Sequence, residues 1–279
     1  MTMDMTRDHE EGIEAPQEAG ATPGAVPPEF LHPPDVVAGD LRRVRALPDW
    51  PCNRLLEGDC LQRLAEVPDS SIHLVLCDLP YGTTQARWDS VIDLEALWAE
   101  YRRVLRPNGV VVLTSQGPFT ARVVLSNEAW FKYKLVWIKS KPTNFLNVRK
   151  QPLRRHEDVC IFYPRQPTYN PQMQAGAAYN KGVRKNQLTG SYGDFRPVKV
   201  ATEGGRFPTD VVYFKTAESE GPVWHPTQKP VQLLERIILA NTHPGDTVLD
   251  VFSGSGSTAI AAQKTGRGFV GCELDPAYF

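Results

Sequence analysis

The chain contains two kinds of hydrophobic pattern, short continuous apolar runs and longer amphipathic stretches. The short runs are rich in Val, Ile, Leu and aromatic residues, which is typical of strands buried inside a sheet. The longer stretches repeat their apolar residues every three or four positions, as amphipathic helices do. The patterns predict strands at 72–78, 110–114, 131–139, 158–163, 247–251 and 268–273, and helices at 94–105, 231–241 and 258–264. Strands and helices in this succession predict an α/β fold.

Two segments do not follow these patterns. Residues 1–38 are rich in Pro, Gly, Ala and Glu and lack periodicity, which predicts a disordered acidic tail. Residues 164–224 are dominated by Pro, Gly, Asn, Gln and basic residues. A long irregular insert in a compact domain is usually functional or disordered. The rest of the chain therefore divides into a first α/β part, 39–163, and a second one, 225–279.

The charges are distributed unevenly, although the net charge is only −1. Residues 1–40 hold nine acidic residues against one arginine, a net charge of −8. Residues 131–200 hold fourteen lysines and arginines against three acidic residues, a net charge of +11. So much positive charge in seventy residues favours a polyanion as the partner.

Targeting signals and metal motifs are not visible in the sequence. No apolar run approaches the roughly 18 residues that a membrane-spanning helix needs, and the N-terminus has acids where a secretory signal is basic and then apolar. The five cysteines form no CxxC pair and no Cys/His cluster with zinc spacing. Three of them lie in apolar runs, and free buried thiols fit a reducing compartment. We therefore expect a cytoplasmic protein without a metal site.

A glycine-rich turn, FSGSGS, joins a predicted strand to a predicted helix. Gly254 and Gly256 allow a tight turn and let a ligand approach the free amides at the start of the helix. The next strand ends in Glu273, where a carboxylate accepts the hydroxyls of a ribose in nucleoside-binding folds. Together these features predict a nucleoside-binding half-fold. With Ala259, the spacing also meets a loose dinucleotide fingerprint, so a NAD-dependent dehydrogenase is an alternative at this point.

The strand at 72–78 ends in an acid that is followed by Leu79, Pro80 and Tyr81. Proline ends a strand because it lacks an N–H group, and this is a purely structural interpretation. Ligands of α/β proteins bind at the carboxyl ends of strands, so Asp78 and Tyr81 are also candidate site residues. Taken alone, this short stretch leaves both interpretations open.

Five segments together resemble the β-class S-adenosylmethionine-dependent DNA amino-methyltransferases, which modify adenine N6 or cytosine N4. FSGSGS resembles their FxGxG cofactor motif, and DLPY resembles their (D/N/S)PP(Y/F/W) catalytic motif. HPTQKP at 225–230 and GCELDPAYF at 271–279 resemble the segments before and after the cofactor motif, and the Gly58-Asp59-Cys60 stretch resembles a further cofactor-side motif. The resemblance covers 55–279. It implies a Rossmann-like methyltransferase sheet in permuted order, with 164–224 as an irregular basic target-recognition insert.

The resemblance also implies a chemistry, in which an amino group of a base turned out of the duplex attacks the methyl group of S-adenosylmethionine. Asp78 would accept a hydrogen bond from that amino group, Leu79 or Pro80 would offer a carbonyl oxygen, and Tyr81 would stack on the base. An Asp in the first motif position favours adenine N6 over cytosine N4. Leu79 departs from the family, which usually has proline there. The residues implied at the cofactor are Asp59, Asp78, Thr227, Lys229, Phe252, Ser253, Gly254, Gly256 and Glu273.

Double-stranded DNA is the partner that the resemblance implies, with neither a metal nor a membrane. Six basic residues in the positively charged part of the chain are candidates for phosphate contacts, namely Lys139, Lys141, Arg149, Lys150, Arg154 and Arg155. A homodimer is common among the proteins that the chain resembles. The sequence leaves open the oligomeric state, the recognised sequence and whether a restriction enzyme accompanies this protein.

Other functions explain fewer of the motifs. Methylation of cytosine C5 needs a cysteine nucleophile, but Pro51-Cys52 precedes the glycine turn by about 200 residues, and DLPY has no role in that chemistry. A dehydrogenase does not explain DLPY or HPTQKP, and a non-enzymatic DNA-binding module does not need a nucleoside pocket. An RNA or protein amino-methyltransferase stays open as the second alternative to DNA.

Overall fold

A computed structural model describes residues 53–82, 89–184 and 196–279, all of which lie in one compact unit, His32–Phe279. The tail predicted at 1–38 lies outside the described residues. The main sheet has eight strands: β1 (Arg54–Glu57), β2 (Ile72–Asp78), β3 (Leu105–Ser115), β4 (Phe131–Thr143), β5 (Arg154–Phe162), β10 (Val211–Phe214), β11 (Thr247–Asp250) and β12 (Gly268–Glu273). The helices are α1 (Cys60–Leu64), α2 (Leu94–Val104), α3 (Pro118–Ser126), α4 (Val231–Asn241) and α5 (Ser257–Lys264).

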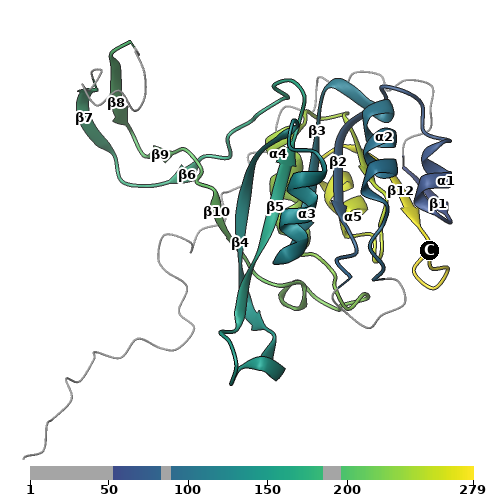
Figure 1. Cartoon of the computed structure of the whole chain (residues 1–279). Coiled ribbons are helices and arrows are strands. Elements are labelled where there is room, and N and C mark those ends of the chain that lie inside the picture. The colour runs from purple at the N-terminus through teal and green to yellow at the C-terminus, as the bar shows by residue number, and fades with distance from the viewer. Residues whose placement is uncertain (1–52, 83–88, 185–195) are drawn as a thin grey trace, which may run out of the picture. The chain divides into compact units, whose positions relative to one another are not determined.

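The strand order across the sheet is β1-β12-β11-β2-β3-β5-β4-β10. All neighbours pair in parallel except β5, which is antiparallel to both β3 and β4. The other strands therefore end at the same edge of the sheet, which we call the carboxyl edge (Figure 1). Loops that follow these strands meet there although they are far apart in the sequence.

Helices cover both faces of the sheet, so the fold is a three-layer α/β structure (Figure 1). Alternate residues of each strand point to opposite faces. In β3, Val111 and Leu113 pack with α1, α2 and α3, whereas Val110 and Val112 pack with α4 and α5. Burying an aliphatic side chain of this size contributes about 1.5–3 kcal/mol, so these two hydrophobic clusters supply most of the driving force for folding.

Carboxylate side chains cap the first turns of the two longest helices. The Asp93 carboxylate accepts hydrogen bonds from the backbone N–H groups of Glu95 and Ala96, which caps α2. In α4, the cap comes from a distant residue, because the Glu220 carboxylate accepts from the N–H groups of Val231 and Gln232. Both caps place a negative charge at the positive end of the helix dipole.

The strands predicted at 72–78 and 268–273 and the helix predicted at 231–241 are confirmed to the residue. The strands β1 and β10 and the helices α1 and α3 were not predicted. The expectation of an irregular insert at 164–224 needs a correction at its end, because β10 pairs with β4 in the main sheet. This four-residue run, VVYF, is too short to stand out beside the polar residues around it. The preceding residues form two separate two-stranded sheets, β6 (Gln174–Ala175) with β9 (Gly205–Arg206) and β7 (Tyr179–Arg184) with β8 (Val198–Thr202).

Candidate active site

The candidate site lies at the carboxyl edge between the neighbouring strands β11 and β2. These strands are parallel, with Val248 opposite Leu74. The helix that follows β11 is α5, and it packs on one face of the sheet, whereas α2, the next helix after β2, packs on the other. Ligands of open α/β sheets bind at such a point, where the connections leave in opposite directions and a crevice opens between the strand ends.

The catalytic motif begins at the end of β2 and the glycine turn follows the neighbouring strand β11. Cys77 and Val251 join them, because the Val251 N–H group donates to the Cys77 sulfur at 3.4 Å. Asp78 is the last residue of β2, and residues 252–256 form the turn after β11. The fold therefore brings together two motifs that are more than 170 residues apart.

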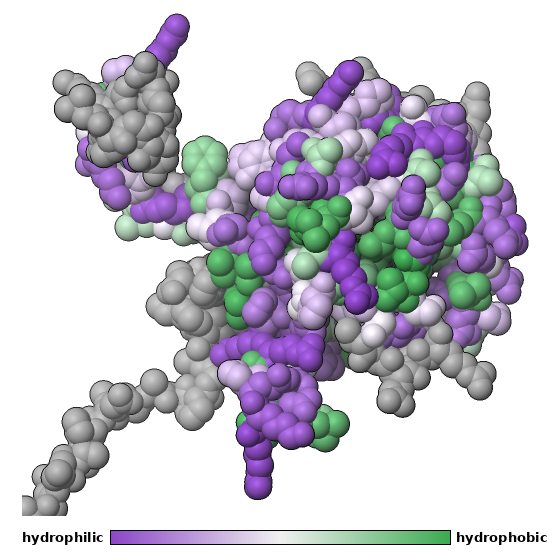
Figure 2. Space-filling model, in the orientation of Figure 1, coloured by the Kyte–Doolittle hydropathy of each residue, from purple (hydrophilic) through white to green (hydrophobic). Residues whose placement is uncertain are grey.

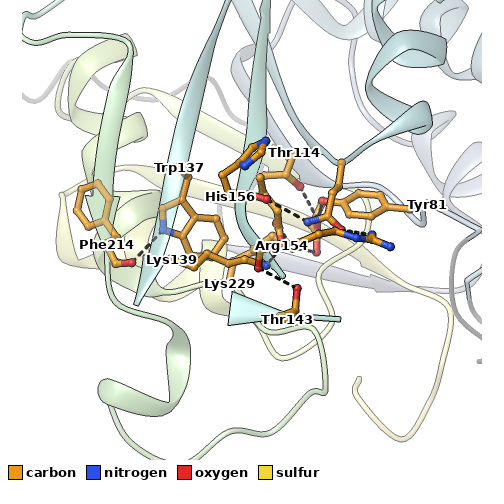
Figure 3. Close-up of polar contacts among 12 residues, drawn as sticks. Tyr81, Thr114, Trp137, Lys139, Thr143, Arg154, His156, Phe214 and Lys229 are labelled. Atoms are coloured by element: carbon orange, nitrogen blue, oxygen red, sulfur yellow. Dashed lines mark hydrogen bonds and ion pairs between the residues drawn. The ribbon is translucent and has the colours of Figure 1, made fainter. Parts of the chain in front are cut away.

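Three side chains from distant parts of the chain bind the carboxylate of Asp78, namely Tyr81, Thr114 and Lys229, which Figure 3 labels. The hydroxyl of Tyr81 donates to Oδ1 at 2.9 Å, and the hydroxyl of Thr114 donates to the same oxygen. The ammonium group of Lys229 lies 2.5 Å from Oδ2. The carboxylate is thereby held in one orientation while its side chain stays 24% exposed.

Lys229 also belongs to a buried row of alternating charges. Its ammonium group lies 3.5 Å from Oε2 of Glu157, and Lys139 binds Oε1 of Glu157 at 2.8 Å. We call Asp78, Lys229, Glu157 and Lys139 the charge row. The two lysine residues are 8% and 5% exposed, so the charge row is largely shielded from water.

The pKa shifts of Glu157 and Lys229, at the centre of the charge row, both favour the charged form. Burial alone would raise the pKa of Glu157, but the charges of Lys229 and Lys139 outweigh burial and hold the pKa below its ordinary value. Burial would lower the pKa of Lys229, but Asp78 and Glu157 outweigh it and raise the pKa. At neutral pH Glu157 and Lys229 are therefore both charged.

Tyr81 has the geometry of a platform at the mouth of the crevice. Its ring lies 5.2 Å from the ring of Phe119, centroid to centroid, and the Lys229 ammonium lies 5.7 Å from its centroid. Burial, reinforced by the charge of Asp78, raises the pKa of Tyr81, so its hydroxyl stays a donor. Leu79, the departure from the family motif, is 2% exposed and packs in the core on the α2 side of the sheet.

The glycine turn is tied to the end of β12. Gly254 has φ +49° and Gly256 has φ +76°, both in the left-handed region that favours glycine. The Gly254 N–H group donates to Oε2 of Glu273 at 2.6 Å. A cavity of about 470 Å³ lies against the turn, and its lining includes Ser253, Gly254 and Gly256.

Asp250, directly before the turn, is a buried carboxyl group that the sequence analysis did not single out. Its Oδ1 accepts a hydrogen bond from the Phe252 N–H group at 3.0 Å. Burial raises its pKa from 3.8 to about 6, although hydrogen bonds from Thr258 and Phe252 oppose the shift. The position of Gly271 beside the turn needs a glycine, because a Cβ atom there would overlap the Ser253 hydroxyl and the Phe269 ring.

The remaining predicted cofactor residues lie at the same edge with different contacts. Asp59 caps α1, where its carboxylate accepts from the Gln62 N–H group at 3.1 Å. The Gly58 N–H group donates to the Glu273 carbonyl at 2.8 Å, which brings the end of β1 to the end of β12. The hydroxyl of Thr227 lies 3.1 Å from Nδ1 of His225, whereas Lys229 contacts Asp78 and Glu157.

The six basic residues predicted to contact phosphate do not share one environment. Lys139 is buried in the charge row, so it does not present its charge to a surface partner, which corrects this part of the prediction. The other five, Lys141, Arg149, Lys150, Arg154 and Arg155, are exposed on the hairpin of β4 and β5. Lys141 is 3.8 Å from Glu218, and Arg154 donates to Gln116 at 2.9 Å (Figure 3).

Sequence reasoning missed two members of this site, Thr114 and Glu157. Thr114 is the Cα partner of Asp78 in the parallel pair of β2 and β3. A polar residue that ends an apolar strand beside the motif strand was a usable signal. Glu157 had no such signal, because its position beside Lys229 depends on the antiparallel strand β5. Among the described residues no group of His, Cys, Asp and Glu has metal-site geometry, and no described helix is long and apolar enough to span a membrane.

The glycine turn with its Glu273 contact and the Asp78–Tyr81 motif thus meet at the carboxyl edge of one α/β sheet. The family model described as DNA methylase, which groups the N6 and N4 methyltransferases, matches residues 72–279, and the chain belongs to this family. It is therefore an S-adenosylmethionine-dependent DNA methyltransferase of the adenine-N6 or cytosine-N4 type.

Individual relatives agree with this membership. The chain is 29% identical over 261 residues to the type II methyltransferase M.BglII of Bacillus subtilis, covering 84% of this chain and 68% of the relative. The crystal structure of the M1.HpyAVI–SAM complex matches with a TM-score of 0.56 and 21% identity, over 81% of this chain and 94% of that one. The cytosine-N4-specific PvuII DNA methyltransferase matches with a TM-score of 0.56 and 17% identity, over 82% and 84%. The two structural matches bear out the Rossmann-like sheet predicted from the sequence.

Proposed function

We propose that this protein methylates a specific sequence in double-stranded DNA, at the exocyclic amino group of a base that it turns out of the duplex. Adenine N6 is the first candidate, because the motif begins with Asp78. Cytosine N4 is the alternative, with the same mechanism. The observation that carries the proposal is that Asp78 and the glycine turn follow neighbouring parallel strands, which are tied together by the Val251–Cys77 hydrogen bond.

The chemistry needs an acceptor that activates a poor nucleophile. The lone pair of an exocyclic amino group is delocalised into the ring, and acceptors for its N–H bonds favour a geometry that frees the lone pair. Asp78 would supply a carboxylate oxygen, and the backbone of Leu79 or Pro80 would supply a carbonyl. Because Lys229, Thr114 and Tyr81 already fix the carboxylate, little reorganisation is needed during reaction.

The residues around the turn fit S-adenosylmethionine, which supplies the methyl group when it is bound. Glu273 would accept the ribose hydroxyls, and Phe252, Ser253, Gly254 and Gly256 would form the wall of the pocket. Asp59, which follows the end of β1, would lie near the adenine or the methionine part of the cofactor. Thr227 would hold the methionine carboxylate. The resemblance implied Lys229 there as well, but its ammonium group is already bound by Asp78 and Glu157. We therefore infer that Lys229 orients the carboxylate of Asp78.

The surfaces that would contact DNA come from two parts of the chain. Residues 164–224 remain our candidate for sequence recognition, except for β10, which belongs to the main sheet. The exposed basic residues of the β4–β5 hairpin would contact phosphates. A cytoplasmic location and a homodimer also remain part of this proposal.

The test is transfer of labelled methyl from S-adenosylmethionine to unmethylated genomic DNA, followed by mass spectrometry of the nucleosides. N6-methyladenine is the expected product. N4-methylcytosine would keep the mechanism and reverse the choice of base. No label in DNA, with the cofactor still bound in calorimetry, would contradict the proposal and make RNA or protein the next substrate to test.

A further inference from the structure

The tip of the β4–β5 hairpin exposes apolar side chains that have no partner within the described residues. Between β4 and β5, Phe145 is 74% exposed, Leu146 83% and Val148 56%. Most large apolar side chains on a protein surface are scattered singly, but these three lie within four consecutive residues. Figure 2 shows the end of the hairpin, at the bottom of the view, as mostly hydrophilic with a small hydrophobic area on its right side.

Positive charge surrounds this apolar tip. The hairpin from Lys139 to His156 contains six lysines and arginines and no Asp or Glu. Five of the six are exposed, and only Lys139 is buried in the charge row. An apolar tip flanked by exposed cations fits a ligand that has phosphates outside and flat apolar surfaces inside, which describes a DNA duplex.

The hairpin projects from the edge of the sheet that carries the candidate site (Figure 1). β4 and β3 are both antiparallel to β5, so they run in the same direction. The carboxyl end of β4 therefore lies at the same edge of the sheet as Asp78. From Lys139 to Thr143, the end of β4, the extended chain advances about 13 Å, and the turn with Phe145 follows. A groove of B-DNA is about 8.5 Å deep, so the tip is long enough to reach the base pairs.

The tip is also held in a defined conformation. Asn144 has φ +72°, and its side-chain oxygen accepts from the Asn147 side chain at 2.8 Å. The Lys150 N–H group donates to the Asn147 carbonyl at 2.8 Å, which closes the turn. A pre-ordered tip loses little conformational entropy when it enters a ligand.

We propose that Phe145 and Leu146 enter the DNA stack and fill the space that the target base leaves when it turns toward Tyr81. Apolar side chains that insert at a base step replace part of the lost stacking. The residues lie outside the predicted recognition segment and outside every motif of the family resemblance. This inference rests on the proposed function, because it assumes that the substrate is duplex DNA.

The experiment compares the double variant Phe145→Ala/Leu146→Ala with the unchanged enzyme on two synthetic duplexes. Both carry the sequence that genomic methylation identifies, and one has an abasic position opposite the target base. That base is already unpaired, so its extrusion needs less help. We expect the rate to fall on the order of 10-fold or more on the paired duplex and less than about 3-fold on the abasic duplex.

The matched controls separate insertion from general damage. Leu125→Ala removes an equally exposed apolar side chain, 71% exposed, near the far end of α3, and should leave both rates unchanged. Phe145→Leu/Leu146→Met keeps an apolar tip and should retain most of the activity. An equal loss on both duplexes, or no loss on either, would overturn the inference while the unchanged enzyme still methylates DNA. If the unchanged enzyme methylates no DNA, the proposed function itself is wrong and the inference is wrong with it.

Discussion

The site between the ends of β2 and β11 and the tip of the β4–β5 hairpin place charged and apolar side chains in opposite environments. In the crevice, four charged groups are paired with one another and largely buried. At the tip, the charges are exposed and of one sign, and the apolar side chains face outward. The first arrangement holds its groups in place before any ligand binds, whereas the second is completed only by a partner.

This difference indicates which region serves the reaction and which serves binding of the substrate. A reaction needs groups whose geometry does not change on binding, and a buried network of ion pairs supplies this rigidity. Recognition of a long polyanion needs exposed cations on an extended element. Substitutions in the crevice should therefore change rate and stability, and substitutions on the hairpin should change how the enzyme binds its substrate.

The largest effect is expected for Asp78→Ala, which removes the acceptor at the centre of the crevice. Methyl transfer should fall about 10²–10³-fold or more, because a fixed electrostatic contact to the reacting group is lost. The affinity for S-adenosylmethionine should change little, as measured by calorimetry. Asp69→Ala is the control, since its side chain is 74% exposed and binds Arg103. Normal activity in Asp78→Ala would contradict the assigned role.

The next effect is expected for Lys229→Met, which leaves two carboxylates of the charge row without their shared cation. Breaking a buried ion pair by removing one partner costs about 3–5 kcal/mol. The free energy of unfolding, measured in urea, should fall by about this amount. Lys141→Met removes an exposed pair with Glu218 at 3.8 Å and should cost less than about 1 kcal/mol. Equal losses in the two variants would show that the buried row contributes no more than a surface pair.

A smaller, pH-dependent effect is expected for Asp250→Asn. The pKa of Asp250 is raised from 3.8 to about 6, so folding favours the neutral acid. Its contribution to stability is present below about pH 4 and is lost as the pH rises through about 6. The shift corresponds to about 3 kcal/mol at most. In Asn the side chain keeps an acceptor for the Phe252 N–H group and never ionises.

The measurement for Asp250→Asn is the difference in unfolding free energy between the variant and the unchanged protein from pH 4 to pH 8. The difference should grow in favour of the variant as the pH rises. A difference that stays constant across this range would contradict the raised pKa. Glu157 contributes with the opposite sign, because its lowered pKa adds stability that is lost toward acid, and it cancels in the difference.

The smallest effect is expected on the hairpin, for Arg149→Gln/Lys150→Gln. Each phosphate contact releases about one counterion, so the salt dependence of DNA affinity should decrease by about one unit of slope per contact. Lys264→Gln is the control, because Lys264 pairs with Glu235 on the helical face of α4 and α5. An unchanged slope in the double variant would exclude these two residues as phosphate contacts.

The parts of the fold that the sequence predicts well are those with a continuous pattern. The strand Ile72–Asp78 and the helix Val231–Asn241 are confirmed because burial of whole apolar runs or faces leaves a periodic trace. The strand Val211–Phe214 was missed because a four-residue edge strand leaves little trace among polar neighbours. Its partner β4 determines its place in the sheet, and single-sequence patterns do not contain that pairing.

The same limit applies to the candidate site. Asp78, Gly254 and Glu273 were identified because each ends or follows a strand, which the local pattern reveals. The bond between Lys229 and Asp78 joins residues 151 positions apart, and no local pattern predicts which carboxylate a buried lysine will choose. Lys139 was misjudged for this reason, since its charge is used inside the protein by Glu157.

The position of β12 in the sheet has a consequence for how the chain folds. β12 lies between β1 and β11, and β12 is the partner of β1 among the strands that the structure describes. Arg54 therefore pairs with Val270, more than 200 residues later, so β1 remains unpaired during synthesis until β12 leaves the ribosome. At about 5–20 residues per second this interval is on the order of 10–40 s. Pairing across so long a separation also slows folding, so closure of this edge of the sheet should be a late event.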